Sequence, residues 1–385
     1  MAYQVVIYCP DQHILYDPAT PDIKGIGGGV IARIRLAQAL ARLGHRVSII
    51  SHVSRAVKHK GVDYLPLANA TIAQTVDILI LTSSGGALSL ESARELNIQA
   101  RLREIWLHGI TRVQGVSSLQ YDYAVGVSNF ICHAVENEWG VSSARLISIY
   151  NGAAVLSTKW WHTHFPRDPY SLIYASHPSK GLDAAIKVLN ILREKDERFK
   201  LHVFGGDALW GGMDKMISAP GVIYHGTQGQ QNVFKYLQRS NISFHLQTII
   251  EAFGMGATES MKHGCIPIAS PLGAYSETIK HGYNGFLVPG DHQSSEVHQQ
   301  TADIIVQLVR APHYAEYIRH QAMEMPWTWD TQAKVWEQHW DWALEKKGET
   351  LHTPASHCRR CGGAWLLTAD GYHCTTCSTY SRDGN

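Results

Sequence analysis

Two glutamates, Glu251 and Glu259, flank a glycine-containing turn that runs into a segment of helical character. Gly254 and Gly256 in this turn let the backbone come close to a ligand, because no Cβ atom obstructs the approach. A helix that begins near Gly256 or Ala257 offers its unpaired N–H groups and the positive end of its dipole to an anion. Glu251 precedes this helix and Glu259 lies about one turn inside it, so both carboxylates are expected to face one pocket.

An anion site between two carboxylates suits a sugar nucleotide. The diphosphate would lie at the end of the helix, and hydroxyl groups of the ligand would donate hydrogen bonds to the carboxylates. The alternative from this stretch alone is an ordinary amphipathic helix on which Glu259 is solvated.

The E-x7-E stretch resembles the signature of retaining GT-B glycosyltransferases, of family 4 in particular. A small apolar strand, CIPIAS, follows it, and Pro271, Gly273, Glu277 and the sequence NGFLVPG come next, as in that family. The resemblance extends over roughly residues 3–345. It implies an α/β fold of two Rossmann-like, doubly wound domains that face a cleft.

Length and composition set the limits within which this resemblance applies. The 385 residues have room for two domains and a small appendage. Hydrophobic residues make up 45% and charged residues 17%, as in soluble globular proteins, and the formal net charge of +1 argues against a global basic field for nucleic acid. We see no signal sequence and no apolar run of about 18 residues. The expected location is the cytoplasm, either free or peripheral at the inner face of the membrane.

The first domain is predicted over residues 1–165. A buried-type strand at residues 3–9 is followed by a loop, three glycines that include Gly28 and Gly29, an amphipathic helix and another strand. This βαβ unit is typical of a doubly wound domain. Glycines at a helix N-terminus suit a phosphate or a closely approaching substrate, although they do not match the dinucleotide-binding fingerprint. Similar glycines in the family face donor and acceptor across the cleft.

A histidine, His108, directly follows a predicted strand at residues 104–107. It therefore falls at the carboxyl end of a strand, where open α/β sheets bind ligands. A packing role is the alternative for a lone histidine. The resemblance places this residue toward the donor sugar, and we include it among the candidate catalytic residues.

The second domain is predicted over residues 166–325. Lys180 stands at the mouth of its first helix, well placed to reach a diphosphate, with a solvated surface lysine as the alternative. The chain departs from the family pattern at one point, since Ala175 occupies a position where many members have arginine. Ser176, His177 and Lys180 would then share the phosphate with the glutamate-flanked helix.

The end of the chain adds a helix and a cysteine-rich module. Residues 326–348 are predicted to form a helix that crosses back to the first domain, and residues 349–385 to form a small zinc ribbon. Two Cys-x2-Cys pairs can hold a structural Zn²⁺ with four thiolates and no open position, and two short strands are predicted around Asp370-Gly371. A stability or docking module is the preferred role, with a nucleic-acid or protein partner as the alternative. The predicted metal ligands are Cys358, Cys361, Cys374 and Cys377.

The resemblance implies a retaining transfer of a hexosyl group from a UDP- or GDP-linked sugar, without a catalytic metal. Glu259 would hold the ribose hydroxyls, Glu251 would accept hydrogen bonds from the donor sugar, and Lys180 would stabilise the leaving diphosphate. The predicted catalytic residues are Glu251, Lys180 and His108, and the predicted donor-binding residues are Gly28, Gly29, Ser176, Lys180, Glu251, Phe253, Gly254, Met255 and Glu259.

The sequence does not identify the acceptor. A surface polysaccharide or lipid-linked glycan assembled at the cytoplasmic face is the default expectation. One alternative is a modified base in DNA, with the zinc ribbon binding nucleic acid, although the near-zero net charge counts against it. A second alternative is a non-catalytic protein that binds nucleotide sugars.

Overall fold

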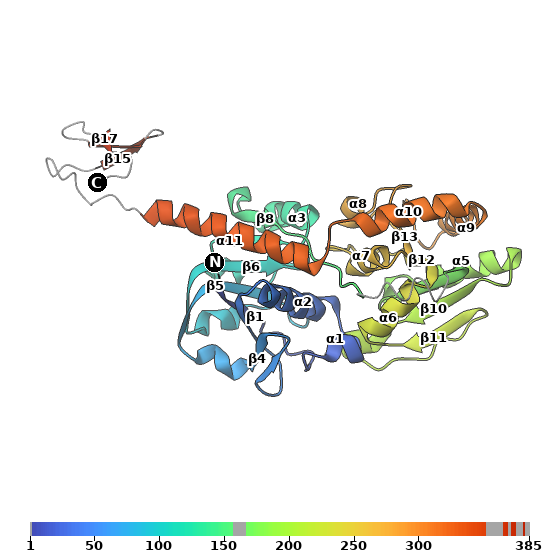
Figure 1. Ribbon diagram of the computed structural model, residues 1–385, viewed down its shortest axis with the longest axis horizontal. Helices are drawn as coiled ribbons and strands as arrows, with labels where there is room; N and C mark the ends of the chain where they lie inside the picture. The colour runs from blue at the N-terminus through green and yellow to red at the C-terminus, as the bar shows by residue number, and fades with distance from the viewer. Residues whose placement is uncertain (1, 157–166, 352–364, 369–370, 375–379, 382–385) are drawn as a thin grey trace. The chain divides into compact units, whose positions relative to one another are not determined.

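The chain forms two compact units, one ending at Val335 and the other beginning at Trp336. The computed structural model describes residues 2–156, 167–351, 365–368, 371–374 and 380–381, with side chains described up to residue 348. The larger unit contains two predominantly parallel sheets, and Figure 1 shows the two domains built on them next to each other. The predicted α/β fold with two Rossmann-like domains is confirmed.

The first domain is built on eight strands in the order β3-β4-β2-β1-β5-β6-β7-β8. Its neighbouring strands are parallel except for the β3–β4 pair. Helix α2 (Gly28–Arg42) lies between the neighbouring strands β1 and β2 in the chain, as the predicted βαβ unit requires. The strands are β1 (Gln4–Tyr8), β2 (Arg46–Ser51), β3 (Val57–His59), β4 (Val62–Pro66), β5 (Gln74–Ser83), β6 (Ile98–Leu107), β7 (Tyr123–Gly126) and β8 (Leu146–Ser148).

The second domain is built on six parallel strands in the order β11-β10-β9-β12-β13-β14. Buried aliphatic side chains fill the space between this sheet and its helices. Leu172 on β9, Leu201 on β10 and Ile242 on β12 are fully buried and lie in register, which keeps the centre of the sheet dry. The strands are β9 (Asp168–Ala175), β10 (Lys200–Phe204), β11 (Val222–Gly226), β12 (Ser240–His245), β13 (Ile266–Ala269) and β14 (Phe286–Leu287).

Both sheets have a point at which the strand order reverses, and ligands of open α/β sheets bind outside the carboxyl ends of the strands at such points. The reversal lies between β1 and β5 in the first sheet and between β9 and β12 in the second. The loops that leave these four strands are therefore the ones expected to form a site. The remaining helices are α1 (Thr20–Ile23), α3 (Asn129–Trp139), α5 (Leu182–Lys195), α6 (Gln230–Leu237), α7 (Met255–Lys262), α8 (Tyr275–Thr278), α9 (Ser295–Arg310) and α10 (Pro312–Glu324).

The chain returns to the first domain before its last long helix, α11 (Trp329–Leu351), begins. The backbone N–H of Ala153 donates to the carbonyl of Trp327 over 2.9 Å. Arg42 on α2 then pairs with Asp330 in the first turn of α11, at 2.5 Å. The residues up to Val335 belong to the larger unit. That the helix as a whole crosses back to the first domain stays a prediction.

In the smaller unit, three short strands form an antiparallel sheet in the order β15-β16-β17. Strands β15 (Trp365–Thr368) and β16 (Gly371–Cys374) pair with Thr368 opposite Gly371, and β17 (Tyr380–Ser381) lies beyond β16. The two predicted strands are therefore present. Cys374 ends β16 without a described side chain, while Cys358, Cys361 and Cys377 lie outside the described residues. The zinc site thus stays a prediction.

Gly181 supplies the first test of the fold, because its backbone lies against the end of β12. It has a φ of +97°, and a Cβ atom there would lie 1.8 Å from the carbonyl oxygen of Leu246. We expect Gly181→Ala to lower the free energy of unfolding by about 3 kcal/mol, through left-handed strain and the backbone clash. Urea denaturation measures this, with Gly348→Ala as a control, since Gly348 faces open space. Equal stability of Gly181→Ala and the wild type would contradict the described packing.

Candidate active site

A cavity of about 310 Å³ lies at the carboxyl ends of both sheets, between the two domains of the larger unit. It is lined by the loop after β1, by the turn after β9 and by the segment that joins β12 to α7. The structure thus brings together every predicted site residue except the four cysteines. These residues are Gly28, Gly29, His108, Ser176, Lys180, Glu251, Phe253, Gly254, Met255 and Glu259.

Helix α7 begins at the cavity wall, with Gly254 as its N-cap residue. Gly254 has a φ of +86°, and a Cβ atom there would lie 2.5 Å from the Tyr275 ring, so only glycine fits. The helix starts at Met255, so the predicted start near Gly256 or Ala257 was slightly too late. The physical reason is that one left-handed residue turns the chain directly into the helix. The N–H groups of the first turn have no acceptor within the helix, so they can donate hydrogen bonds to a ligand in the cavity.

Lys180 and Glu251 form an ion pair at the mouths of two adjacent strands. The Lys180 Nζ atom lies 2.8 Å from Glu251 Oε2, and both side chains are about four-fifths buried. The Nε2 amide of Gln247 donates to the same carboxylate oxygen over 3.0 Å. The two charges balance each other, yet Lys180 keeps two further N–H donors and Glu251 keeps its second oxygen for a ligand.

Two buried polar atoms on the cavity wall have no hydrogen-bond partner among the described residues, namely His108 Nε2 and Asn151 Oδ1. The His108 ring packs against Trp106 with ring centroids 4.3 Å apart. Burial, with a smaller effect from the Arg33 charge, lowers the pKa of His108 to about 3. His108 is therefore neutral near pH 7 and suited to orienting a hydroxyl group. Buried polar atoms without partners are rare, so both atoms favour a polar ligand here.

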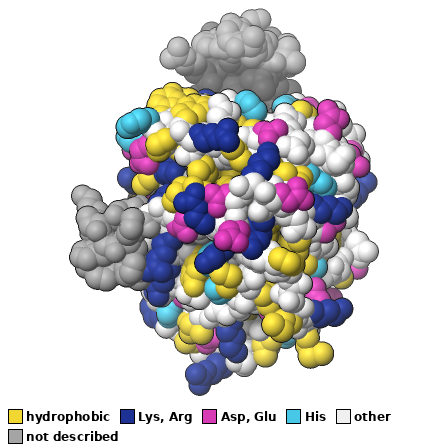
Figure 2. Space-filling model, turned by 90° about the vertical axis from the view of Figure 1, so that its right-hand side faces the viewer, with side chains coloured by type: hydrophobic (Ala, Val, Ile, Leu, Met, Phe, Trp, Pro, Cys, Tyr) yellow, Lys and Arg dark blue, Asp and Glu magenta, His cyan; other side chains and the backbone are white. Residues whose placement is uncertain are grey.

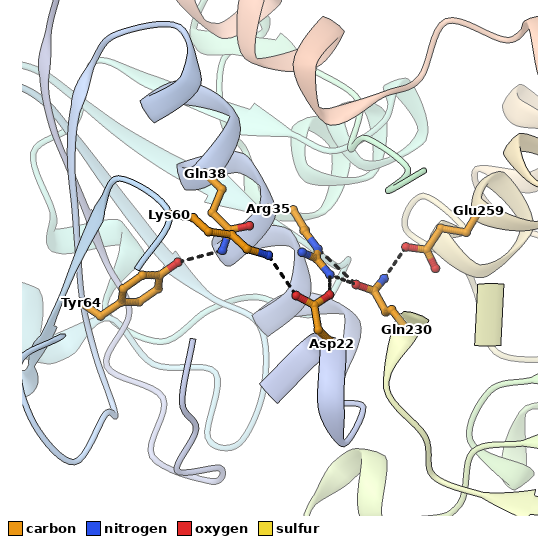
Figure 3. A network of polar contacts seen from close by, with 7 residues as sticks. All are labelled: Asp22, Arg35, Gln38, Lys60, Tyr64, Gln230 and Glu259. Atoms are coloured by element: carbon orange, nitrogen blue, oxygen red, sulfur yellow. Dashed lines mark hydrogen bonds and ion pairs between the residues drawn. The ribbon is translucent and has the colours of Figure 1, made fainter. Parts of the chain in front are cut away.

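Glu259 lies inside α7 and is only 8% exposed. Burial raises the pKa of its carboxyl group to about 8, although the Arg35 charge and a hydrogen bond from Gln230 act in the opposite direction. The Gln230 Nε2 amide donates to Glu259 Oε1 over 2.6 Å, and Figure 3 shows Gln230 between Glu259 and residues of the first domain. The solvated alternative for Glu259 is therefore wrong.

His177, which was expected to share a phosphate, is already engaged by other side chains. Its ring stacks on Trp210 with centroids 3.7 Å apart, and its Nε2 atom lies 3.3 Å from the Asp207 carboxylate. Its Nδ1 atom accepts a hydrogen bond from the backbone N–H of Ser179. Both His177 and Trp210 line the cavity, but the ring nitrogens of His177 have protein partners.

Glu277 of the second domain contacts the first domain. Its carboxylate accepts hydrogen bonds from the backbone N–H of Asn129, over 3.1 Å, and from Tyr150 Oη, over 2.8 Å. Asn129 is the first residue of α3, so Glu277 of the second domain caps a helix of the first. Ser128 Oγ adds a hydrogen bond to the Ala252 carbonyl over 2.6 Å.

Sequence reasoning missed three amide side chains of the site, Gln230, Gln247 and Asn151. Gln230 and Gln247 donate hydrogen bonds to the two glutamates. Asn151 lines the cavity, and its buried Oδ1 atom has no partner among the described residues. No local spacing marks an amide as functional, so only the contacts could have identified these residues.

Among the described residues, no group of three or more His, Cys, Asp or Glu side chains is arranged to hold a metal ion. No helix in this part of the chain is long and apolar enough to cross a membrane.

The raised pKa of Glu259 predicts how the stability of the protein changes with pH. The pKa is raised from 4.5 to about 8, so the folded chain holds this proton more tightly than the unfolded chain. The resulting stabilisation is complete below about pH 4.5 and is lost as the pH rises through 8. Between pH 5 and pH 8.5, the melting temperature of the wild type should therefore fall several degrees more than that of Glu259→Gln, which stays neutral.

Scanning calorimetry at several pH values measures this difference, with the exposed Glu197→Gln as the matched control. Parallel curves for the wild type and Glu259→Gln would show that Glu259 is not held in its neutral form.

Part of this site lies in a segment that matches a known family. Residues 162–322 match the family model described as "Glycosyl transferases group 1". This segment contains Lys180, Glu251 and Glu259. No protein with a curated description matches the sequence.

Solved structures resemble the chain over most of its length. A glycosyltransferase from Rickettsia africae is 16% identical with a TM-score of 0.62, and the match covers 89% of this chain and 99% of that one. Sucrose-phosphate synthase from Thermosynechococcus elongatus is 15% identical with a TM-score of 0.65, covering 89% and 100%. The Anabaena protein Alr3699/HepE in complex with UDP-glucose is 15% identical with a TM-score of 0.58, covering 91% and 99%.

At this level of identity the solved structures show the fold, and they confirm the predicted GT-B arrangement. The family match adds the enzyme class. Residues 162–322 match a group 1 glycosyltransferase domain within a GT-B fold, and the protein is therefore a glycosyltransferase.

Proposed function

We propose that the enzyme transfers a hexosyl group, with retention of configuration, from a nucleoside-diphosphate sugar to an acceptor hydroxyl. The Lys180–Glu251 pair carries this proposal. It places an ammonium donor and a carboxylate acceptor at the mouth of the second sheet, in the same cavity as the N-terminus of α7. A diphosphate would bind the ammonium group and the N-terminus of the helix. The hydroxyl groups of a sugar would donate hydrogen bonds to the carboxylate.

Each part of the donor then has a matching group. The diphosphate binds Lys180 and the N–H groups that begin at Met255, while the ribose hydroxyls donate to Glu259. The donor sugar lies beside Glu251, with the backbone of residues 253–255 along its edge. His108 reaches a sugar hydroxyl from the first domain, through the Nε2 atom that lacks a partner among the described residues.

The chemical step follows from these placements. The bond between the anomeric carbon and the leaving phosphate oxygen breaks, and negative charge develops on that phosphate. Lys180 and the positive end of α7 stabilise this charge, and fixed donors of this kind contribute about 3 kcal/mol each to lowering a barrier. The acceptor hydroxyl attacks the anomeric carbon from the same face, and its proton passes to the leaving phosphate oxygen. The proposal uses no divalent metal.

For the donor, a UDP-linked sugar is the first candidate, because the similar Anabaena protein was solved with UDP-glucose. A GDP-linked sugar is the second. For the acceptor, we propose a surface polysaccharide or lipid-linked glycan assembled in the cytoplasm or at the inner face of the membrane. The four-cysteine module would serve as a zinc-bound docking or stability element beside this activity.

The nucleic-acid alternative receives less support. The formal net charge is +1, whereas proteins that bind DNA tightly neutralise many phosphates. Figure 2 shows one face of the protein, on which basic and acidic side chains are intermingled instead of gathered into one basic surface. The non-catalytic alternative does not explain why Lys180 and Glu251 are held in contact within the cavity.

The test compares the binding of UDP, GDP and ADP with that of the matching nucleosides by calorimetry. One diphosphate should bind, and Lys180→Ala should weaken its binding about tenfold or more while leaving that of the nucleoside unchanged, because it removes a charge-assisted hydrogen bond. Lys187→Ala is the matched control, since Lys187 lies outside the cavity lining and donates a hydrogen bond to Gln293. Glu251→Ala should abolish turnover of the corresponding nucleotide sugar.

Absence of binding by any diphosphate would contradict the proposed donor site. Equal diphosphate binding by wild type and Lys180→Ala would contradict the role given to Lys180.

A further inference from the structure

A chain of polar contacts joins Glu259 to the first domain across the cavity edge (Figure 3). Gln230, at the start of α6, donates to Glu259 Oε1 over 2.6 Å. The Gln230 Oε1 atom accepts from Arg35 of α2, over 2.7 Å from Nη2 and 3.2 Å from Nε. Arg35 in turn pairs with Asp22 of α1 at 2.5 Å, and Lys60 pairs with the other oxygen of Asp22 at 3.1 Å. The path therefore runs from the second domain into three segments of the first.

Only one orientation of the Gln230 amide is compatible with these neighbours. The Arg35 guanidinium can only donate hydrogen bonds, so it must meet the Gln230 carbonyl oxygen. The Gln230 NH₂ group then faces Glu259 and supplies the donor that the carboxylate needs. Gln230 is 5% exposed and Glu259 is 8% exposed, so water does not readily replace this contact.

The Gln230 amide leaves Glu259 free to bind a ligand. A direct Arg35–Glu259 pair would engage both carboxylate oxygens in a bidentate contact and would favour full ionisation. The neutral amide engages Oε1 alone, and the backbone N–H of Ala154 is a second partner of the carboxylate. A carboxylate has about four acceptor positions, so capacity remains for two ribose hydroxyls.

The backbones of the two domains touch beside this network. A Cβ atom at Gly229 would lie 2.1 Å from the carbonyl oxygen of Asp22, and one at Gly25 would lie 2.3 Å from that of Gln228. Gly229 directly precedes Gln230 and has an ordinary φ of −62°. The Arg35–Gln230 contact therefore requires the two domains to be closed to backbone contact.

We propose that Gln230 and Arg35 are positioning residues for the ribose carboxylate, so that recognition of the ribose depends on closure of the two domains. The inference rests on the proposed function, in which Glu259 receives the ribose hydroxyls. Asp22 fixes the direction of the Arg35 guanidinium, Arg35 fixes the Gln230 amide, and Gln230 fixes the Glu259 carboxylate. The first domain thereby contributes to donor recognition through Arg35, which does not line the cavity.

The test measures the ratio of the dissociation constants of 2′-deoxy-UDP and UDP, or of the GDP pair if GDP is the diphosphate that binds. The wild type should prefer the ribonucleotide about tenfold, as expected when one buried hydrogen bond is lost. Gln230→Ala and Arg35→Ala should bring the ratio to near one by weakening UDP binding alone. Arg35→Lys should recover part of the ratio, because lysine can donate one hydrogen bond to Gln230 Oε1.

Arg42→Ala is the matched control. It removes another arginine of α2, whose exposed partner is Asp330, and should leave the ratio unchanged. Gly229→Ala provides a second route that changes no polar group. The added methyl group clashes with the first-domain backbone, so this variant should also lower the ratio, while calorimetric melting shows that it is folded.

The outcomes separate the two claims. If the wild type binds no nucleoside diphosphate, the proposed function fails and the inference fails with it. If the wild type binds UDP and 2′-deoxy-UDP equally, donor binding stands but the positioning role is overturned. If Gln230→Ala and Arg35→Ala discriminate as the wild type does, or weaken both nucleotides alike, only the inference is overturned.

Discussion

The parallel pairing of β9 with β12 at the centre of the second sheet brings Lys180 and Glu251 of the candidate site together. Because Leu172 and Ile242 lie in register, the turn after β9 and the segment after β12 leave the sheet side by side. Lys180 follows the first strand and Glu251 follows the second, which explains their 2.8 Å contact across 71 residues of sequence. The backbone of Gly181 lies directly against Leu246, so this pairing allows little freedom in where Lys180 is presented.

The cavity combines polar groups with little net charge. The Lys180 ammonium is balanced by Glu251, and burial favours the neutral forms of Glu259, His108 and His245, whose pKa values shift to about 8, 3 and 3. A diphosphate that enters the cavity would thus meet the Lys180 ammonium and the N-terminus of α7. The Glu259 carboxyl group would repel it little, because burial favours the neutral form of this group. Fixed dipoles in such a site need little reorganisation when charge develops.

The local pattern allowed Glu251, Glu259, Lys180 and His108 to be predicted from the sequence, because each stands at the carboxyl end of a strand or the start of a helix. The structure brings all four into one cavity. The long-range partners could not be predicted in the same way, since Arg35 is separated from its partner Gln230 by 195 residues. The start of α7 was placed too late because the φ of a single glycine decides it. The four-cysteine site remains a prediction from spacing.

The most direct test of the account is a crystal structure of the protein with UDP bound. The account predicts the diphosphate within hydrogen-bond distance of Lys180 and of the first N–H groups of α7, and both ribose hydroxyls on Glu259. The Gln230 amide should still bridge Glu259 and Arg35. A nucleotide bound outside this cavity, or one whose ribose makes no contact with Glu259, would contradict the account.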